Sequence, residues 1–196
     1  MSHLRYHKSS GDSKQLPTFP TISNFIPIRI FASHPFGSKH LVIILSDMAT
    51  RNQESGSRGE KLVAKSQTCP KCKKRQTLKT LPPNFKCADI ICDFCGFLAQ
   101  VKTFEAVDVN KLPPTILGAA WKPQRERMES GIFYPLYLVA SQRTRTRYAI
   151  WYLPADFQTP EMFVARNPLS STARRAGWQG FTIDLRKAMS QPVRLH

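Results

Sequence analysis

Apolar and polar positions alternate in short runs along much of this chain, and the pattern predicts more strand than helix. Runs rich in β-branched and aromatic side chains are typical of strands, and they occur at residues 87–92, 97–104, 133–141, 148–153 and 181–185. The third and fourth runs are joined by a polar, arginine-rich loop, which is typical of a β-hairpin. We therefore expect an α/β (α+β) fold with a mixed sheet and few helices.

Two segments have helical composition. In the first, residues 59–67, Ser57 and Glu60 have the spacing of a capping box, so we expect a helix to begin close to residue 59. The second segment covers residues 113–131, and Pro123 must break or kink it.

The first 47 residues differ in character from the rest. They are rich in serine and proline and show no regular period. We expect residues 1–47 to form a disordered tail, or to be a non-native extension upstream of a start at Met48. Residues 48–196 are expected to fold as one domain, since hydrophobic residues make up 41% of the chain and suffice for one core.

The charge balance suggests the kind of partner. Lys and Arg total 29 against 13 Asp and Glu, a formal net charge of +16. Such an excess of positive charge indicates a polyanionic partner, and nucleic acid is the commonest partner of this kind. No apolar run is long enough to span a bilayer. We therefore expect no membrane partner and a cytoplasmic, nucleoid-associated protein.

Four of the five cysteines have the spacing of zinc ligands. Cys69 and Cys72 form one CxxC motif, and Cys92 and Cys95 form a second after 19 intervening residues. One tight turn directs two thiolates at the same metal, and two such turns complete a tetrahedron, so we expect a structural Zn2+. Two disulfides are the alternative, which the odd number of cysteines disfavours. Cys87 is expected to be a half-buried small residue and not a ligand.

A carboxylate, an amide and an ammonium group fall together on two predicted strands. Asp89 lies among apolar neighbours, where a carboxylate is costly unless it is paired. Gln100 and Lys102 share one face of the following strand because side chains alternate with a period of two. Mg2+ held by Asp89 and the Gln100 oxygen, beside a lysine, would suit phosphodiester cleavage. The alternative is a simple ion pair between Asp89 and Lys102, since this spacing often arises by chance.

Two basic groups are candidates for DNA contact. They comprise Arg143, Arg145, Arg147, Arg174, Arg175 and Trp178. The first three alternate and would project from one face of the hairpin toward consecutive phosphates, or would form an ordinary solvated hairpin tip. Trp178 would stack on DNA or be buried in the core.

Several motifs together resemble a known family. The run from Leu169 to Leu185 contains TARRAGWxG, and the CPxC motif, the ADxxCxxC motif and the following xxK strand precede it in the same order. This combination resembles the catalytic domain of the DpnI and Dam-replacing family of restriction endonucleases, over roughly residues 55–190. The resemblance implies a PD-(D/E)xK nuclease core for residues 48–196, with flanking helices and a four-cysteine zinc site inserted between the two catalytic strands.

The resemblance also assigns roles to residues. Asp89 and Lys102 match catalytic positions, and Gln100 stands where the better-known enzyme has a glutamate. The four paired cysteines match the zinc ligands. Glu60 would contribute a contact near the metal, as a glutamate on the N-terminal helix does in several nucleases of this superfamily, in addition to its predicted capping role.

Two functions of different classes follow. The first is a Mg2+-dependent type II restriction endonuclease acting on double-stranded DNA, with methyl-directed cleavage as one form and a transient homodimer on DNA to supply two active sites. The second is a catalytically weak or inactive zinc-stabilised DNA-binding module. The second is motivated by Gln100, which removes one negative charge from the site, and by a sequence that ends at His196 without the winged-helix reader of the family's better-known member. A purely structural zinc ribbon is disfavoured by the TARRAGW run.

Overall fold

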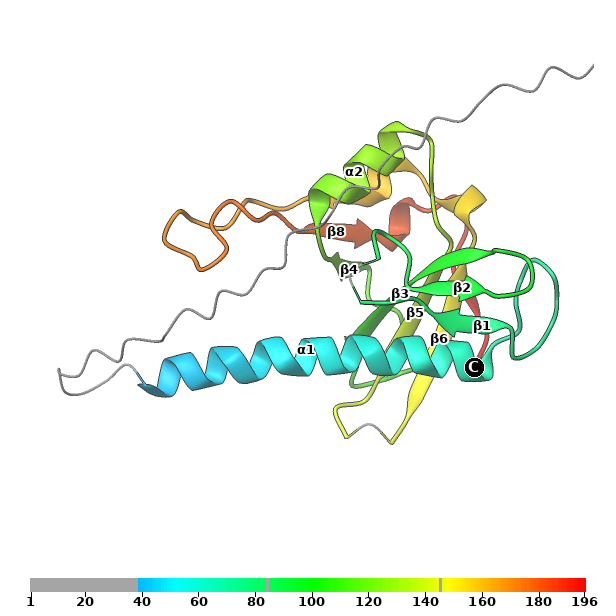
Figure 1. Cartoon of the computed structure of the whole chain (residues 1–196), viewed down its shortest axis with the longest axis horizontal. Helices are drawn as coiled ribbons and strands as arrows, with labels where there is room; N and C mark the ends of the chain where they lie inside the picture. The colour runs from blue at the N-terminus through cyan, green and yellow to red at the C-terminus, as the bar shows by residue number, and fades with distance from the viewer. Residues whose placement is uncertain (1–38, 84, 145) are drawn as a thin grey trace, which may run out of the picture. The chain divides into compact units, whose positions relative to one another are not determined.

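The computed structural model describes residues 39–83, 85–144 and 146–196 (Figure 1). Most of the predicted tail, residues 1–38, lies outside the described residues, and so does Arg145. Two α-helices and nine strands form in these ranges. They are α1 (Lys39–Ser66), β1 (Leu78–Thr80), β2 (Ile90–Cys92), β3 (Leu98–Glu105), β4 (Thr115–Gly118), α2 (Trp121–Glu129), β5 (Leu136–Ser141), β6 (Tyr148–Leu153), β7 (Phe163–Ala165), β8 (Phe181–Asp184) and β9 (Val193–Arg194).

The strands form two sheets. The larger has the order β1-β2-β3-β5-β6-β9, and the smaller has the order β4-β8-β7. Only β3 and β5 pair in parallel among these strands, while every other described pair is antiparallel. The mixed α+β fold is therefore confirmed, as are the strand through residues 97–104 and the hairpin of β5 and β6.

Each face of the larger sheet covers its own hydrophobic core. On β5, Tyr137 and Val139 belong to a core that includes Val63 of α1, while Leu136 and Leu138 belong to a second core shared with the smaller sheet. This division follows from the two-residue period of a strand, which sends successive side chains to opposite faces. Almost every β5 and β6 position is buried for this reason. The sheet is thus the central layer, with α1 on one side and the smaller sheet with α2 on the other.

Helix α1 is longer than the sequence indicated. It begins at Lys39, so Ser57 and Glu60 lie within the helix and the predicted capping box is wrong. Backbone amides in the middle of a helix already have carbonyl partners four residues earlier, so no cap is needed there. Packing against β3 and β1 holds the glycine-containing stretch in helical form.

Residues 113–131 also differ from expectation. The first part forms β4, and the helix begins only at Trp121. Pro123 is therefore in the first turn of α2, where backbone N–H groups have no intrahelical acceptor. The predicted break at Pro123 is wrong, because a proline in this turn starts a helix without kinking it.

Gly59 allows α1 to approach β3 closely. A Cβ atom at residue 59 would overlap the hydroxyl of Thr103, whereas a Cβ at Gly56, about one turn earlier in the helix, meets nothing within 4 Å. Gly59 is buried, and its neighbour Glu60 is carried against β3 by the same contact.

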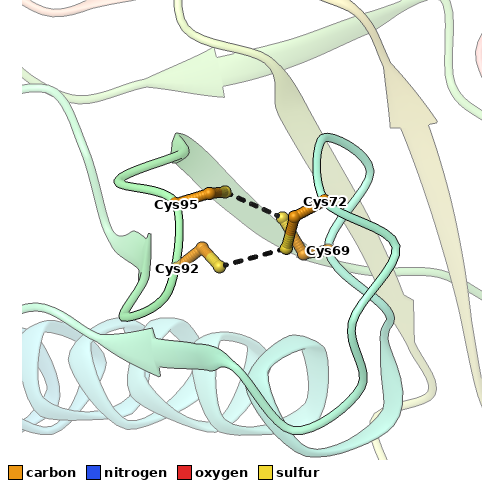
Figure 2. Close-up of side chains that lie close together, drawn as sticks. All are labelled: Cys69, Cys72, Cys92 and Cys95. Atoms are coloured by element: carbon orange, nitrogen blue, oxygen red, sulfur yellow. Dashed lines mark hydrogen bonds between the residues drawn. The ribbon is translucent and has the colours of Figure 1, made fainter.

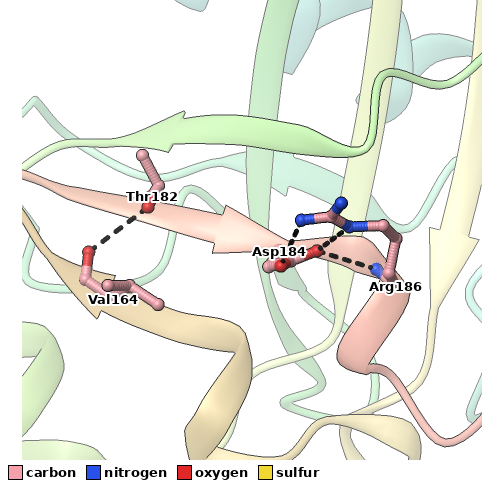
Figure 3. A network of polar contacts seen from close by, with 4 residues as sticks. All are labelled: Val164, Thr182, Asp184 and Arg186. Carbon is pink, nitrogen blue, oxygen red and sulfur yellow. Dashed lines mark hydrogen bonds and ion pairs between the residues drawn. The ribbon is translucent and has the colours of Figure 1, made fainter.

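An ion pair at a buried aspartate ends the smaller sheet. Asp184 accepts hydrogen bonds from the Arg186 side chain at 2.8 Å and from the Arg186 backbone amide at 3.1 Å (Figure 3). In the same view, the Thr182 hydroxyl donates to the Val164 carbonyl and joins β8 to β7. The Arg186 side chain lowers the pKa of Asp184 from 3.8 to about 2.

We predict opposite effects of alanine at the two glycines of α1. Gly59→Ala should lower the free energy of unfolding by about 1–3 kcal/mol, because the new methyl group overlaps Thr103. Gly56→Ala, the matched control, should raise it by up to about 1 kcal/mol through helix propensity. Adding Thr103→Ala should recover most of the Gly59→Ala loss. Urea unfolding measures all four proteins, and equal effects at the two glycines would contradict the close approach.

The Asp184–Arg186 pair predicts a pH dependence. Because the folded-state pKa of Asp184 is depressed, its stabilisation is complete above about pH 5 and is lost as the pH falls toward 2. The stability difference between the wild type and Asp184→Asn should therefore shrink between about pH 5 and pH 2. Urea midpoints at several pH values test this. Asp156→Asn, at an exposed carboxylate, controls for the general effect of removing one negative charge.

Candidate zinc-supported active site

The two CxxC motifs form turns of the same geometry. In the first, Lys73 N–H donates to the Cys69 carbonyl at 2.9 Å, and Cys69 N–H donates to the Lys74 carbonyl at 3.0 Å. The second repeats both bonds, from Gly96 to Cys92 and from Cys92 to Phe97. The residue after each motif, Lys73 or Gly96, has a left-handed φ of 61° or 69°. This conformation turns the chain so that both thiols of a pair face the same point.

The two turns meet with their four sulfurs at one centre (Figure 2). All four Sγ atoms lie within 4.8 Å of one another, and the Cys69–Cys95 and Cys72–Cys92 separations are both 3.7 Å. A tetrahedral Zn2+ with Zn–S bonds of about 2.3 Å places its sulfurs about 3.8 Å apart. The cluster can thus hold a metal such as zinc, and sulfurs at this separation are not joined by disulfides.

The surroundings of the cluster favour a thiolate at Cys92, whereas burial raises the pKa of Cys69 to about 12 and also raises the pKa of Cys95. Burial raises the pKa of Cys92, but hydrogen bonds from the Thr77 side chain and from the amides of Cys95 and Phe94 outweigh it and lower the pKa to about 6. The neighbouring loop is basic, and Lys74 lies 3.3 Å from the centre of the Phe94 ring. A divalent metal with four thiolates carries a net charge of about −2, which this loop offsets.

Cys87 stands apart from this cluster. It is half-buried, has a φ of 63°, and is absent from the four-thiol group found in the described residues. The expectation that Cys87 is half-buried is confirmed, and its exclusion from the ligand set stays a prediction.

The strands beside the second turn change partners at Gln100. The first two residues of β3, Leu98 and Ala99, pair with β2, whereas residues 100–105 pair with β5. Asp89 immediately precedes β2, and its N–H donates to the Ala99 carbonyl at 2.9 Å. The two strands therefore separate at the level of Asp89 and Gln100.

The Asp89 carboxylate bridges this separation. Its Oδ2 accepts a hydrogen bond of 2.7 Å from the backbone N–H of Val101, the residue between Gln100 and Lys102. Gln100 and Lys102 occupy alternate positions of β3 and so share a face. The structure thus brings together the three residues that the sequence selected, although Asp89 lies just before its strand and not in the middle of it.

Gln100 is buried without a full set of partners. Only 4% of its surface is exposed, and Oε1 has no hydrogen-bond partner among the described residues, while Nε2 donates to Oε1 of Gln124 at 3.2 Å. A buried, unpartnered carbonyl oxygen is costly unless water or a cation binds it. The donor set of carboxylate and amide oxygens at this point fits Mg2+.

Glu60 is a second carboxyl group at this point. Burial, followed by the nearby Asp89 carboxylate, raises the pKa of Glu60, while Lys102 and Lys61 lower it. Glu60 on α1 is therefore near enough to Asp89 and Lys102 for both charges to act on its carboxyl group. Glu60 lies inside α1 and does not cap the helix. Capping therefore does not explain why a glutamate occurs near Asp89.

The predicted DNA-contacting residues lie elsewhere in the fold. Arg143 and Arg147 are exposed in the loop between β5 and β6, as the predicted hairpin requires, and their contact with phosphates stays a prediction; Arg145 is outside the described residues. Arg174 and Arg175 are exposed in the connection between β7 and β8, which extends away from the sheets (Figure 1).

Trp178 has an intermediate environment. Its ring is half-buried, and the Arg175 guanidinium lies 4.6 Å from the ring centre. Leu169 and Trp178 pair through a backbone hydrogen bond of 2.9 Å, which closes the base of this loop. Trp178 is therefore neither in the central core nor fully open to a ligand.

Gln124 was missed by the sequence analysis. It lies in α2 within the charged run KPQRERME, and it is the buried residue of that helix, with 6% of its surface exposed. A glutamine in such a polar stretch gives no signal of burial. Its burial and its hydrogen bond with Gln100 both depend on where α2 packs, which the local sequence does not show.

A family model described as DpnI, Dam-replacing family, matches residues 43–192. The match covers most of the sequence, so the chain belongs to the Dam-replacing family. Membership of this family indicates a nuclease of the restriction type that acts on DNA. The match begins before the boundary predicted at residue 48, and the division of the chain at that point stays a prediction.

Among the described residues, no helix is both long enough and apolar enough to span a bilayer.

We predict that the thiol cluster binds one zinc ion per chain and that its removal costs stability. Cys92→Ser should abolish stoichiometric zinc and lower the melting temperature, because the metal joins the turn after α1 to the β2–β3 turn. Cys87→Ser, the matched control outside the cluster, should keep the metal. Elemental analysis and thermal melts with and without chelator measure both effects. A metal-free wild type with an unchanged melt would contradict a structural metal.

Proposed function

We propose that this protein is a Mg2+-dependent DNA endonuclease of the type II restriction type, with Asp89, Gln100 and Lys102 as its catalytic residues. The single observation that supports it best is the hydrogen bond from Val101 N–H to Asp89. This bond fixes the Asp89 carboxylate at the backbone position between Gln100 and Lys102, as we would expect of a PD-(D/E)xK nuclease with glutamine at the middle position.

Asp89 and Gln100 would hold the Mg2+ through carboxylate and amide oxygens, while the cysteine cluster would hold a structural Zn2+. Bound Mg2+ supplies polarisation of the scissile phosphate and a more acidic water. Lys102 stabilises the negative charge that develops on the phosphate during attack. Glu60, half-buried and close to Asp89, adds a carboxyl group whose ionised form a cation would favour.

Double-stranded DNA is the proposed substrate, and the net charge of +16 supports it. Arg143, Arg147, Arg174 and Arg175 are exposed and available for phosphate contacts, and the same role is proposed for Arg145. Trp178 would keep Arg175 oriented through their stacking. A transient homodimer on DNA would provide a second site for the opposite strand, and adenine methylation is the modification to test for specificity.

The second candidate is a catalytically weak DNA-binding module supported by zinc. Gln100 favours it, because a neutral amide replaces a carboxylate and weakens the attraction for Mg2+. The two candidates differ in turnover and not in DNA affinity.

We predict that Asp89→Ala and Lys102→Ala each reduce plasmid cleavage at least about 100-fold while DNA binding is retained, because they remove metal ligation and transition-state stabilisation. Asp156→Ala and Lys187→Ala, at exposed side chains, are the matched controls. Gln100→Glu should lower the Mg2+ concentration for half-maximal cleavage, because it restores a second carboxylate of the same length.

The measurement is cleavage of plasmid DNA with and without adenine methylation, in Mg2+ or Mn2+, with binding followed by gel shift. The nuclease proposal is overturned if neither the wild type nor Gln100→Glu cleaves any of these substrates while binding persists. That outcome would support the binding module.

A further inference from the structure

The amide of Gln100 has two unlike ends, and only one of them suits a cation. The oxygen can ligate a metal, whereas the NH2 group repels it and needs an acceptor. In the structure the NH2 end donates to Oε1 of Gln124 at 3.2 Å, and the oxygen has no hydrogen-bond partner among the described residues. Both side chains are buried, with 4% and 6% of their surfaces exposed.

The packing of α2 places this acceptor. Trp121, the first residue of the helix, packs against Phe181 of β8 in a tilted arrangement with ring centroids 5.9 Å apart. A Cβ atom at Gly118 would overlap the same Phe181 ring, so the chain leading into α2 also lies close to the smaller sheet. Gln124 is about one turn further along and faces β3. The smaller sheet therefore fixes where the acceptor for Gln100 stands.

We infer that Gln124 is a positioning residue that turns the Gln100 oxygen toward the metal site. This inference rests on the proposed function, because it concerns how a neutral amide can replace a carboxylate there. A carboxylate presents an oxygen whichever way it is rotated, so it needs no such partner. An amide needs one, since leaving its buried NH2 group without an acceptor costs free energy equivalent to about tenfold or more in an equilibrium.

The test is a double-mutant cycle with Mn2+ binding as the readout, followed by electron paramagnetic resonance of the free ion. Gln124→Met keeps the size of the side chain and removes the acceptor. It should weaken Mn2+ binding about tenfold when residue 100 is glutamine. Combined with Gln100→Glu, the same change should alter binding less than about twofold, because orientation no longer matters.

A second variant gives the opposite sign. Gln124→Glu can only accept, so it should preserve or tighten Mn2+ binding beside Gln100. In the Gln100→Glu background it should weaken binding, because two carboxylates then face each other at the place of the present hydrogen bond. A general effect of added negative charge would tighten binding in both backgrounds.

Gln158→Met is the matched control. Gln158 is also a buried glutamine, and its Nε2 donates to the Tyr134 carbonyl at 2.8 Å. Its replacement should leave Mn2+ binding unchanged. Zinc content and melting temperature verify that each variant is folded.

The outcomes separate the two claims. If Mn2+ binding depends on Asp89 but Gln124→Met weakens it equally in both backgrounds, or in neither, the positioning role is overturned and the nuclease proposal stands. If no variant, including Gln100→Glu, binds Mn2+ in a way that Asp89→Ala abolishes, the metal site of the proposed function is wrong and the inference is overturned with it.

Discussion

One backbone amide without a partner on the neighbouring strand, the N–H of Val101, organises the candidate site. Strand β3 changes partners at Gln100, so the N–H of Val101 points toward the side from which β2 has departed. A buried N–H group without an acceptor is strongly unfavourable, and the Asp89 carboxylate accepts from it at 2.7 Å. The same bond that completes the sheet edge also fixes a carboxylate beside Gln100 and Lys102. The hydrogen bond between Val101 and Asp89 therefore serves both the fold and the candidate site.

The two faces of the larger sheet and one of its turns contact different parts of the protein. One face packs on α1 through Val63, and the other packs on the smaller sheet and α2. Gly59 brings α1 close to Thr103, which carries Glu60 into the field of Asp89 and Lys102. The thiol cluster holds the β2–β3 turn against the turn that follows α1. Helix α1, the smaller sheet with α2, and the thiol cluster thus each constrain the region around Asp89, Gln100 and Lys102.

The sequence predicted those features that depend on local spacing. The CxxC pairs, the period of β3 and the β5–β6 hairpin all act over a few residues, and the structure contains each of them. The features that the sequence could not predict depend on packing between distant segments. The early start of α1, the strand at residues 115–118 and the burial of Gln124 are all of this kind. The loop position of Arg143 and Arg147 also follows from local pattern, because a polar run between two apolar runs is typical of a hairpin connection. The roles of the arginines and of the catalytic residues remain predictions.

The closeness of the cysteines along the chain has a consequence for the order of folding. The thiol pairs join residues no more than 26 positions apart, whereas the parallel pairing of β3 with β5 joins residues that lie farther apart in the chain. Closing a shorter loop costs less entropy, and nonlocal parallel pairing is slow. The metal-binding turns are therefore expected to assemble early and to present β3 as a ready template, on which β5 and the remainder of the sheet then add. We expect a shortage of metal to slow this step, because the four thiols then lack the ion that would hold the two turns together.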